Sequence, residues 1–157
     1  MRIKTILTLD QADSISNRVF SCGLIESMHP LAVAILDFGG NPIVTKRQDG
    51  AGILRTEIAI GKAWGALGMG MSSRSIRDRL ADRPAFQGAL SVVASGKFVP
   101  VPGGVLVYDD RSEVIGAVGV SGDTSEKDEY CAIEAIRSVG FESDPRVPSS
   151  TWRDSKL

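Results

Sequence analysis

Two cations on one predicted helix have the type and spacing to bind an anionic ligand. The segment from Ile53 to Leu67 has helical periodicity, and one of its sides carries Arg55, Ala59, Lys62 and Ala66. A face of small residues with two cations suits an acidic small molecule. Long basic side chains that extend into solvent from a partly exposed helix would give the same pattern.

Two glycine turns could bring backbone amides to the same ligand. Gly103 and Gly104 follow two prolines, and Ser121 and Gly122 end an apolar stretch. Backbone amides in such turns can bind a ligand or a developing oxyanion at short range. A rigid turn at the end of an edge strand would use the same residue types, so both interpretations stay open for Gly103 and Gly104.

The second turn does not have the features of a phosphate site. Its glycines, Gly116, Gly119 and Gly122, lack the spacing of a dinucleotide fingerprint. The helix start that follows is crowded with carboxylates that would repel a phosphate: Asp123, Glu126, Asp128 and Glu129. We therefore expect Gly116 and Gly119 to permit close packing, Asp123 or Thr124 to cap the helix, and Glu126 and Glu129 to be solvated.

An acid/base reaction on a small carboxylate is the catalytic interpretation of these residues. Lys62 or Arg47 would hold the acid, and Asp49 or Asp123 would move a proton, as in a cofactor-independent isomerase, hydratase or lyase. No nucleophile, base and orienting group can be combined, because His29 is the sole histidine. The two cysteines, Cys22 and Cys131, belong to no Cys/His cluster, so we expect buried thiols and no dedicated metal site.

Composition narrows the range of partners. The formal net charge is −1, which gives no field to attract nucleic acid or an anionic membrane. No apolar run approaches the ~18 residues of a membrane span, and the first residues do not resemble a signal peptide. We expect a cytoplasmic protein.

The pattern of apolar residues predicts an α/β protein of the α+β type, with helices on an antiparallel five-stranded sheet. A capping box at Thr8 and Gln11 starts a helix that ends near Met28, and residues 31–47 form a hairpin. After the second helix, the pattern predicts short helices divided before Pro84, a strand within residues 97–104, and a hairpin that closes near Asp109 to Ser112. A last helix runs from about Ser125 to Val139. The expected order is α-β-β-α-α-β-β-β-α, in one domain of residues 1–140 with a polar tail, 141–157, that is loose or held through Trp152.

Five segments together resemble the GlcG/HbpS family, which includes the C-terminal domain of PduO-type proteins. They are "AVAILDFGGNPI", "RQDGAG", "IAIGKAWGALGMG", "VPVPGGVLV" and "VIGAVGVSGDTSEKDE", and the resemblance covers about Thr8 to Gly140. It implies a profilin-like architecture, assembly into homo-oligomers, and heme as a cofactor or ligand. The segment "MGMSSRSIRD" departs from the form that is frequent in the family.

Binding of heme or another tetrapyrrole is the leading function that the resemblance implies. Such a ligand needs an apolar slot, an axial donor and cations for its propionates. The possible donors are His29, Met69, Met71 and Tyr108. The expected ligand-binding residues are Arg47, Arg55, Lys62, Gly103, Gly104, Ser121 and Gly122. Catalysis on a small carboxylate is the alternative, and an assembly module with a rim of charges at "RSIRDRLADR" is a third.

Overall fold

The structure is a computed structural model that describes residues 5–157. In these residues the elements are α1 (Leu9–Ile25), β1 (Ala32–Asp37), β2 (Pro42–Arg47), α2 (Leu54–Met69), α3 (Ser73–Leu80), α4 (Pro84–Val93), β3 (Gly104–Tyr108), β4 (Val114–Ser121), α5 (Ser125–Ser138), β5 (Glu142–Asp144) and a final 3-10 turn (Trp152–Asp154). No helix in this part of the chain is long and apolar enough to cross a bilayer.

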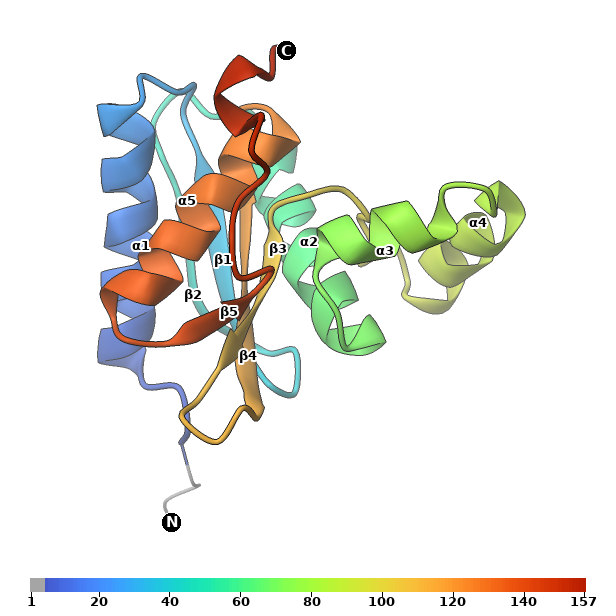
Figure 1. The fold of residues 1–157 in the computed structure, drawn as a ribbon, viewed down its shortest axis with the longest axis horizontal. Coiled ribbons are helices and arrows are strands. Elements are labelled where there is room, and N and C mark those ends of the chain that lie inside the picture. Colours follow the sequence, from blue (N-terminus) through green and yellow to red (C-terminus); the bar gives the residue numbers. More distant parts are fainter. Residues whose placement is uncertain (1–4) are drawn as a thin grey trace.

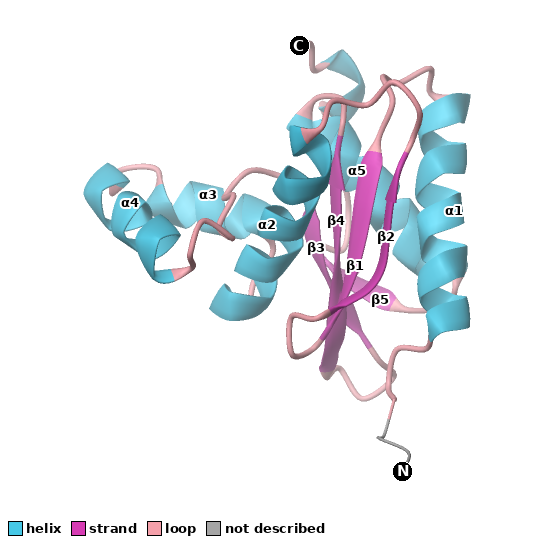
Figure 2. Cartoon of the chain, turned by 180° about the vertical axis from the view of Figure 1, so that it is seen from behind, coloured by secondary structure: helices cyan, strands magenta, loops and turns pink. Residues whose placement is uncertain are grey.

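The elements form three layers around one antiparallel sheet. The strand order is β2-β1-β4-β3-β5, so β1 and β4 pair although an entire helical region separates them in the sequence. Helices α1 and α5 cover one face, and α2 covers the other (Figures 1 and 2). Helices α3 and α4 project beyond α2 as a helical arm, residues 73–93 (Figure 1).

Most predicted elements are confirmed, and local signals explain why. The Thr8 side chain accepts from the Gln11 amide, while the Gln11 side chain accepts from the Thr8 amide, so the capping box forms as expected. Strand β1 is buried along most of its length, as its continuous apolar run indicated. Thr124 caps α5 by accepting from the Lys127 amide.

The predicted element order is wrong in the place of one strand, and it has one helix fewer than the three, α2, α3 and α4, that precede β3. Residues 97–103 do not form a strand, and the fifth strand is instead β5, which follows α5 and pairs with β3. Pro100 and Pro102 have no amide hydrogen to donate to a ladder. The preceding residue, Val99, donates its amide to the Gly61 carbonyl at 3.3 Å, so this segment packs on α2 rather than in the sheet.

The last residues are attached to the body of the protein. Strand β5 continues the sheet beyond β3, and Trp152 is buried. The Trp152 ring stacks on Tyr130 of α5, with 3.7 Å between the ring centroids. Trp152 therefore holds residues 141–157 to α5 of its own chain, and these residues contribute a strand.

The two faces of the sheet carry different types of apolar side chain. The face under α1 and α5 presents mainly valine and isoleucine, whereas the face under α2 presents Ala34, Leu36, Leu106 and Ala117. A Cβ on Gly119 would collide with the Ala59 carbonyl of α2, and one on Gly104 would collide with the Lys62 carbonyl. The expected close packing at Gly119 is thus confirmed, and α2 lies directly on the backbone of β3 and β4.

This packing predicts a strong position effect for glycine-to-alanine changes. Gly119→Ala should destabilise the protein by about 3 kcal/mol or more, because backbone rather than a flexible side chain occupies the space. Gly88→Ala, in α4 where an added Cβ meets nothing within 4 Å, should stabilise by about 1 kcal/mol. Urea unfolding measures both. Equal stabilities for the two variants would contradict the close approach.

Candidate functional site

Lys62 is the centre of the region that the sequence predicted, but it is not on an open face. Its side chain is 2% exposed. The ammonium lies 2.8 Å from Oδ2 of Asp128 and donates to the Val120 carbonyl at 3.0 Å. The alternative that Lys62 extends into solvent is therefore wrong, and its charge is already paired within the chain. Lys62 thereby links α2 to Asp128 of α5 and to the carbonyl of Val120 in β4.

Asp128 completes a buried ion pair between helices on opposite faces of the sheet. It is 1% exposed, and its Oδ1 accepts the amide of Asp123 at 3.1 Å. Burial raises the pKa of Asp128 to about 6, while the charge and the hydrogen bond of Lys62 oppose this rise. Asp128 is thus mainly ionised at neutral pH, and its contact with Lys62 joins α2 to the start of α5.

The glycine turns meet Lys62, as the sequence suggested, but they form packed interior. Gly103 has φ +117°, and a Cβ there would lie 2.9 Å from the Lys62 ammonium. The Gly104 amide donates to the Ser73 hydroxyl at 2.7 Å. A Cβ on Gly122 would collide with the Pro30 carbonyl. Side chains and backbone of the chain itself occupy these turns, which favours the structural interpretation of Gly103 and Gly104.

Arg55 and Ser121 form a corner beside this ion pair, in which Ser121 is fully buried and Arg55 is only partly buried. The Arg55 guanidinium lies 3.4 Å from the Ser121 hydroxyl and is partly buried. Within residues 5–157 it has no carboxylate at ion-pair distance. Arg47 is the last residue of β2 and donates to the Ala51 carbonyl at 2.7 Å, and Asp49 lies on the segment between β2 and α2. Among the predicted ligand-binding residues, Arg55 in this corner therefore has a charge that is available to an anionic ligand.

Asp123 serves as an anchor for the turn before α5. Its carboxylate accepts the amides of His29 at 2.9 Å and Thr124 at 2.8 Å, and it pairs with Lys127 at 3.2 Å. Burial raises the pKa of Asp123, but these hydrogen bonds and the lysine charge outweigh burial and leave the pKa below its usual value. A carboxylate held ionised in this way is poorly suited to carry a proton at neutral pH.

Glu129 differs from its expected role at a solvated helix start. It is fully buried, and neither carboxylate oxygen has a hydrogen-bond partner in the described part of the chain. Its nearest cation is Arg74 of α3, with 3.2 Å between Nη1 and Oε1. Burial raises the pKa of Glu129 to about 7, although Arg74 and Arg77 oppose the rise. The prediction for Glu129 is therefore wrong.

An apolar cleft between α2 and α4 is the site best suited to an apolar ligand. This α2–α4 cleft has a volume of about 170 Å³ and is lined by Trp64, Gly65, Gly68, Met69, Leu90, Val93, Ala94 and Phe98. A neighbouring hollow of about 140 Å³ shares two lining residues, Trp64 and Gly68, and adds Phe38 from the β1–β2 turn. Two aromatic rings, a thioether and almost no polar lining make the cleft hydrophobic.

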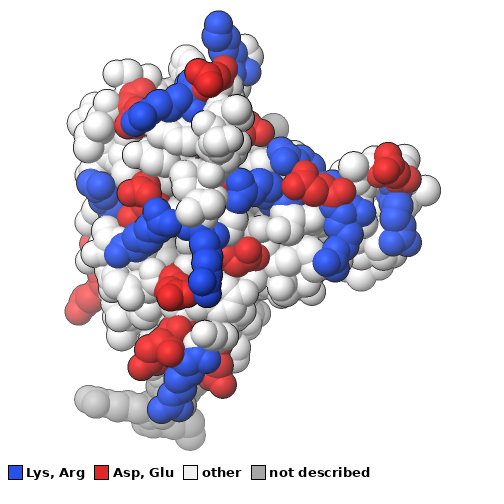
Figure 3. All heavy atoms as spheres, in the orientation of Figure 1, with Lys and Arg blue, Asp and Glu red and all other residues white. Residues whose placement is uncertain are grey.

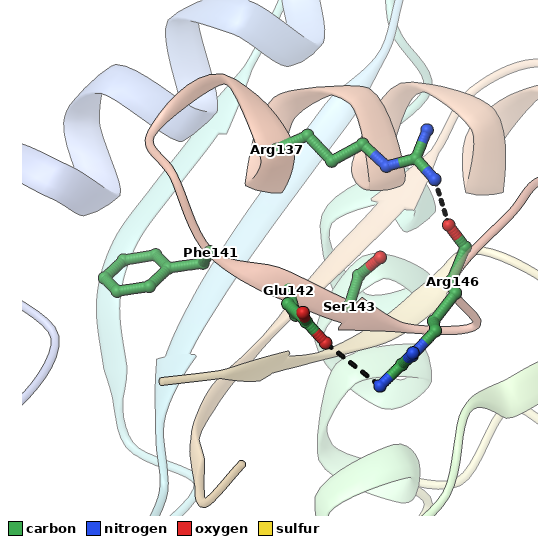
Figure 4. A pocket seen from close by; sticks show the side chains of 5 residues that line it. All are labelled: Arg137, Phe141, Glu142, Ser143 and Arg146. Carbon is green, nitrogen blue, oxygen red and sulfur yellow. Dashed lines mark hydrogen bonds and ion pairs between the residues drawn. The ribbon is translucent and has the colours of Figure 1, made fainter. Parts of the chain in front are cut away.

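A more polar hollow lies under the end of α5, where Figure 4 shows the residues around β5. It has a volume of about 200 Å³, and its arginines already have partners. Arg137 donates to the Arg146 carbonyl, and Arg146 pairs with Glu142 at 3.1 Å. Basic and acidic side chains also alternate over the face seen in Figure 3. Neither feature offers a concentrated charge for a polyanion.

The structure also places the remaining predicted donors. Met69 lines the α2–α4 cleft, and Met71 is partly buried against the small core of the helical arm. His29 is exposed. Tyr108 lies near Asp144, at the end of β3 that is farther from Gly104. No group of three or more His, Cys, Asp or Glu side chains suited to a metal occurs among residues 5–157.

Asp128 is the residue that sequence reasoning used only as a repulsive charge. A signal was available, because Asp128 and Glu129 lie four residues before Ala132 and Ile133, on the apolar stripe of α5. Acidic residues on such a stripe indicate a buried partner. The pattern did not reveal which cation the partner would be, because Lys62 is 66 residues away in the sequence.

The ion pair predicts strong energetic coupling between Lys62 and Asp128. Lys62→Met should destabilise the protein by about 3–5 kcal/mol, because it leaves a buried carboxylate unpaired. Adding Asp128→Asn should recover much of this loss. Lys46→Met, which breaks a partly exposed pair with Asp13, should cost no more than about 1 kcal/mol. Denaturant unfolding measures the stability of the Lys62→Met variant, the Asp128→Asn variant, their double variant and the Lys46→Met control. The coupling energy is the part of the double variant's stability change that the two single changes do not add up to. Purely additive changes in stability would contradict the prediction.

Glu129 predicts a dependence of stability on pH. Since its pKa is raised in the folded state, its contribution is largest at low pH and is lost as pH rises through about 7. Glu129→Gln removes this loss, so the variant should gain about 2 kcal/mol relative to the parent between about pH 5 and about pH 8. Glu126→Gln, at a partly exposed carboxylate, is the control. A stability difference between the parent and the Glu129→Gln variant that is independent of pH would contradict the prediction.

Comparison with known proteins relates this fold to a family. The chain is 32% identical over 107 residues to an uncharacterized 15.0 kDa protein of Citrobacter freundii, covering 68% of this chain and 74% of that protein. It is 33% identical over 110 residues to the corrinoid adenosyltransferase PduO of Salmonella typhimurium, covering 70% of this chain but only 32% of PduO. The crystal structure of a PduOC–heme complex superposes with a TM-score of 0.78 at 26% identity, covering 89% of this chain and 99% of that one.

The family assignment rests on a match to a family model that is longer than either of the two sequence matches. The family model described as "Haem degrading protein HbpS-like" matches residues 7–137, which include every element from α1 to nearly the end of α5. The resemblance that the sequence segments indicated is thereby confirmed. This chain belongs to the HbpS-like family.

Proposed function

We propose that this protein binds heme or a related tetrapyrrole in the α2–α4 cleft. The observation that carries the proposal is the combination of an apolar slot, two aromatic rings and a thioether at one place in a chain of this family. A flat macrocycle gains most from apolar and aromatic contacts. The crystal structure of the PduOC–heme complex supports heme as the ligand class, because the superposition covers 89% of this chain and 99% of the PduOC chain.

The lining of the cleft fits part of what a heme requires. Trp64 and Phe98 offer ring surfaces, and Met69 offers a thioether that can serve as an axial ligand. The iron and macrocycle would supply the redox and ligand chemistry, while these side chains would hold and orient the ring. The exposed Lys97, next to Phe98 in the chain, is the cation best placed in the sequence for a propionate.

The size of the cleft supports a homo-oligomer as part of the proposal. A cavity of about 170 Å³ is smaller than the roughly 300–1,000 Å³ that typically encloses a ligand of this size. Val92 and Val93 of α4 are 80% and 82% exposed, and Phe38 is also exposed. A second copy over this apolar surface would cover both these residues and the open side of the bound ring. A cytoplasmic location belongs to the same proposal.

A small carboxylate at the Arg55–Ser121 corner is the second candidate. The supporting observation is a partly buried guanidinium beside a hydroxyl, with no carboxylate at ion-pair distance in the described residues. Arg47, Gly103, Gly104 and Gly122 would be the further contacts of the sequence-based proposal. For catalysis the candidates are Asp49, Lys62 and Asp123, but Lys62 is already paired and Asp123 is held ionised, so the geometry favours binding.

Hemin titration of the purified full chain tests the tetrapyrrole proposal. We expect a saturable Soret shift and quenching of Trp64 fluorescence, with Trp152→Phe used to isolate that signal. Val93→Glu should weaken binding about tenfold or more, because it places a charge in the apolar lining. Val147→Glu makes the same change at an exposed valine away from the cleft and should have less effect.

Met69→Leu separates iron ligation from ring binding. It keeps the volume of the lining while removing the thioether, so the Soret position should change more than the affinity. A flat difference spectrum would reject heme. Saturable binding that responds to Arg55→Leu, but to neither Val93→Glu nor Met69→Leu, would move the site to the Arg55–Ser121 corner.

A further inference from the structure

The two cysteines, which the sequence separates by more than a hundred residues, come together in the core. Cys22 of α1 is 3% exposed and Cys131 of α5 is fully buried, and both belong to the core between these helices and the sheet. Helices α1 and α5 lie against each other on the same face of the sheet (Figure 1). The two thiols are close enough for each to shift the pKa of the other, and the Cys131 thiol donates to Sδ of Met28 at 3.5 Å.

The surroundings make the two thiols chemically unequal. The hydrogen bond from Cys131 lowers the pKa of Cys22, burial raises it, and the charge of Arg18 lowers it further, so that the net shift is downward. The same hydrogen bond and burial raise the pKa of Cys131. The charges of Glu134 and Glu26 raise the pKa of Cys22 and so oppose the effect of Arg18. Cys22 is therefore the thiol that ionises first, and a thiolate is the nucleophilic form.

The buried side chain of Arg18 is a second feature near Cys22 that favours a negative charge there. It precedes Cys22 by one helical turn on α1, and its Nε is buried with no hydrogen-bond partner in residues 5–157. A buried donor without an acceptor is costly unless a nearby charge compensates it. Met28 is only partly buried, so this sulfur cluster lies one side chain away from solvent.

We propose that Cys22 and Cys131 are a peroxide-oxidisable pair that forms a disulfide between α1 and α5. The Cys22 thiolate attacks a peroxide oxygen, which forms an S–O bond and breaks the O–O bond, and the leaving hydroxide takes up a proton. Cys131 then loses its proton and attacks the Cys22 sulfur, which forms the S–S bond and releases the second oxygen as water. Two thiols lose two electrons and two protons, and one hydrogen peroxide becomes two waters.

This cross-link would act on the body of the fold rather than on the α2–α4 cleft. It would join the helix that begins the fold to the helix whose first turn holds Asp128, and it would close a loop of most of the chain. A bond across so long a loop restricts the unfolded state strongly. The proposal stands independently of any ligand, because neither cysteine lines the cleft.

The test uses the reduced, purified full chain treated with hydrogen peroxide, then denatured and alkylated. We expect a monomer about 2 Da lighter that no longer reacts with the alkylating reagent, and a peptide map that joins Cys22 to Cys131. The melting temperature should rise by roughly 5–15 °C and return to its starting value with dithiothreitol. Met28→Leu, which removes the neighbouring thioether, should leave the cross-link intact.

Two serine variants separate the roles of the thiols. Cys131→Ser should leave Cys22 to progress to sulfinic acid, while Cys22→Ser should leave Cys131 largely unoxidised. Melting of the reduced variants shows whether each one is folded before oxidation. Three outcomes would overturn the proposal: thiols that remain alkylatable after peroxide, cross-links between molecules, or independent oxidation of both cysteines in the parent chain.

Discussion

The close approach of α2 to the sheet is the constraint on which the rest of the structure depends. Gly104 and Gly119 leave no side chain between the strands and the carbonyls of Lys62 and Ala59. A lysine on the inner side of a helix this close cannot reach bulk water, so it needs a buried anion. Asp128 supplies that anion from the other side of the sheet, and the pair thereby fixes the start of α5 relative to α2.

The other side of the same helix determines where the cleft forms. Gly61 and Gly65 receive Phe98 and Val99, so the chain after α4 packs on α2 instead of joining the sheet. This contact holds the end of the helical arm against α2. The arm then encloses an apolar cleft that the sheet itself does not contribute to. Gly61 and Gly65, which would be costly in an isolated helix, are explained by these two contacts.

Each layer of the fold therefore has its own chemistry. The α2 side of the molecule carries Lys62 of the ion pair and, between α2 and α4, the proposed tetrapyrrole cleft. The other side carries helices α1 and α5, with the two thiols in the core between them and the sheet. Asp128 and Cys131 are on the same helix, so α5 is the element through which both layers are connected.

The sequence by itself determined the elements whose signals are local. The capping box at Thr8, the hairpin of β1 and β2, and the Thr124 cap all depend on residues a few positions apart, and the family segments indicated the fold class. Only the tertiary structure decided which charges are buried, that β5 completes the sheet, and that Cys22 meets Cys131. These features depend on contacts between distant segments, and periodicity shows that a residue faces inward without showing what it faces.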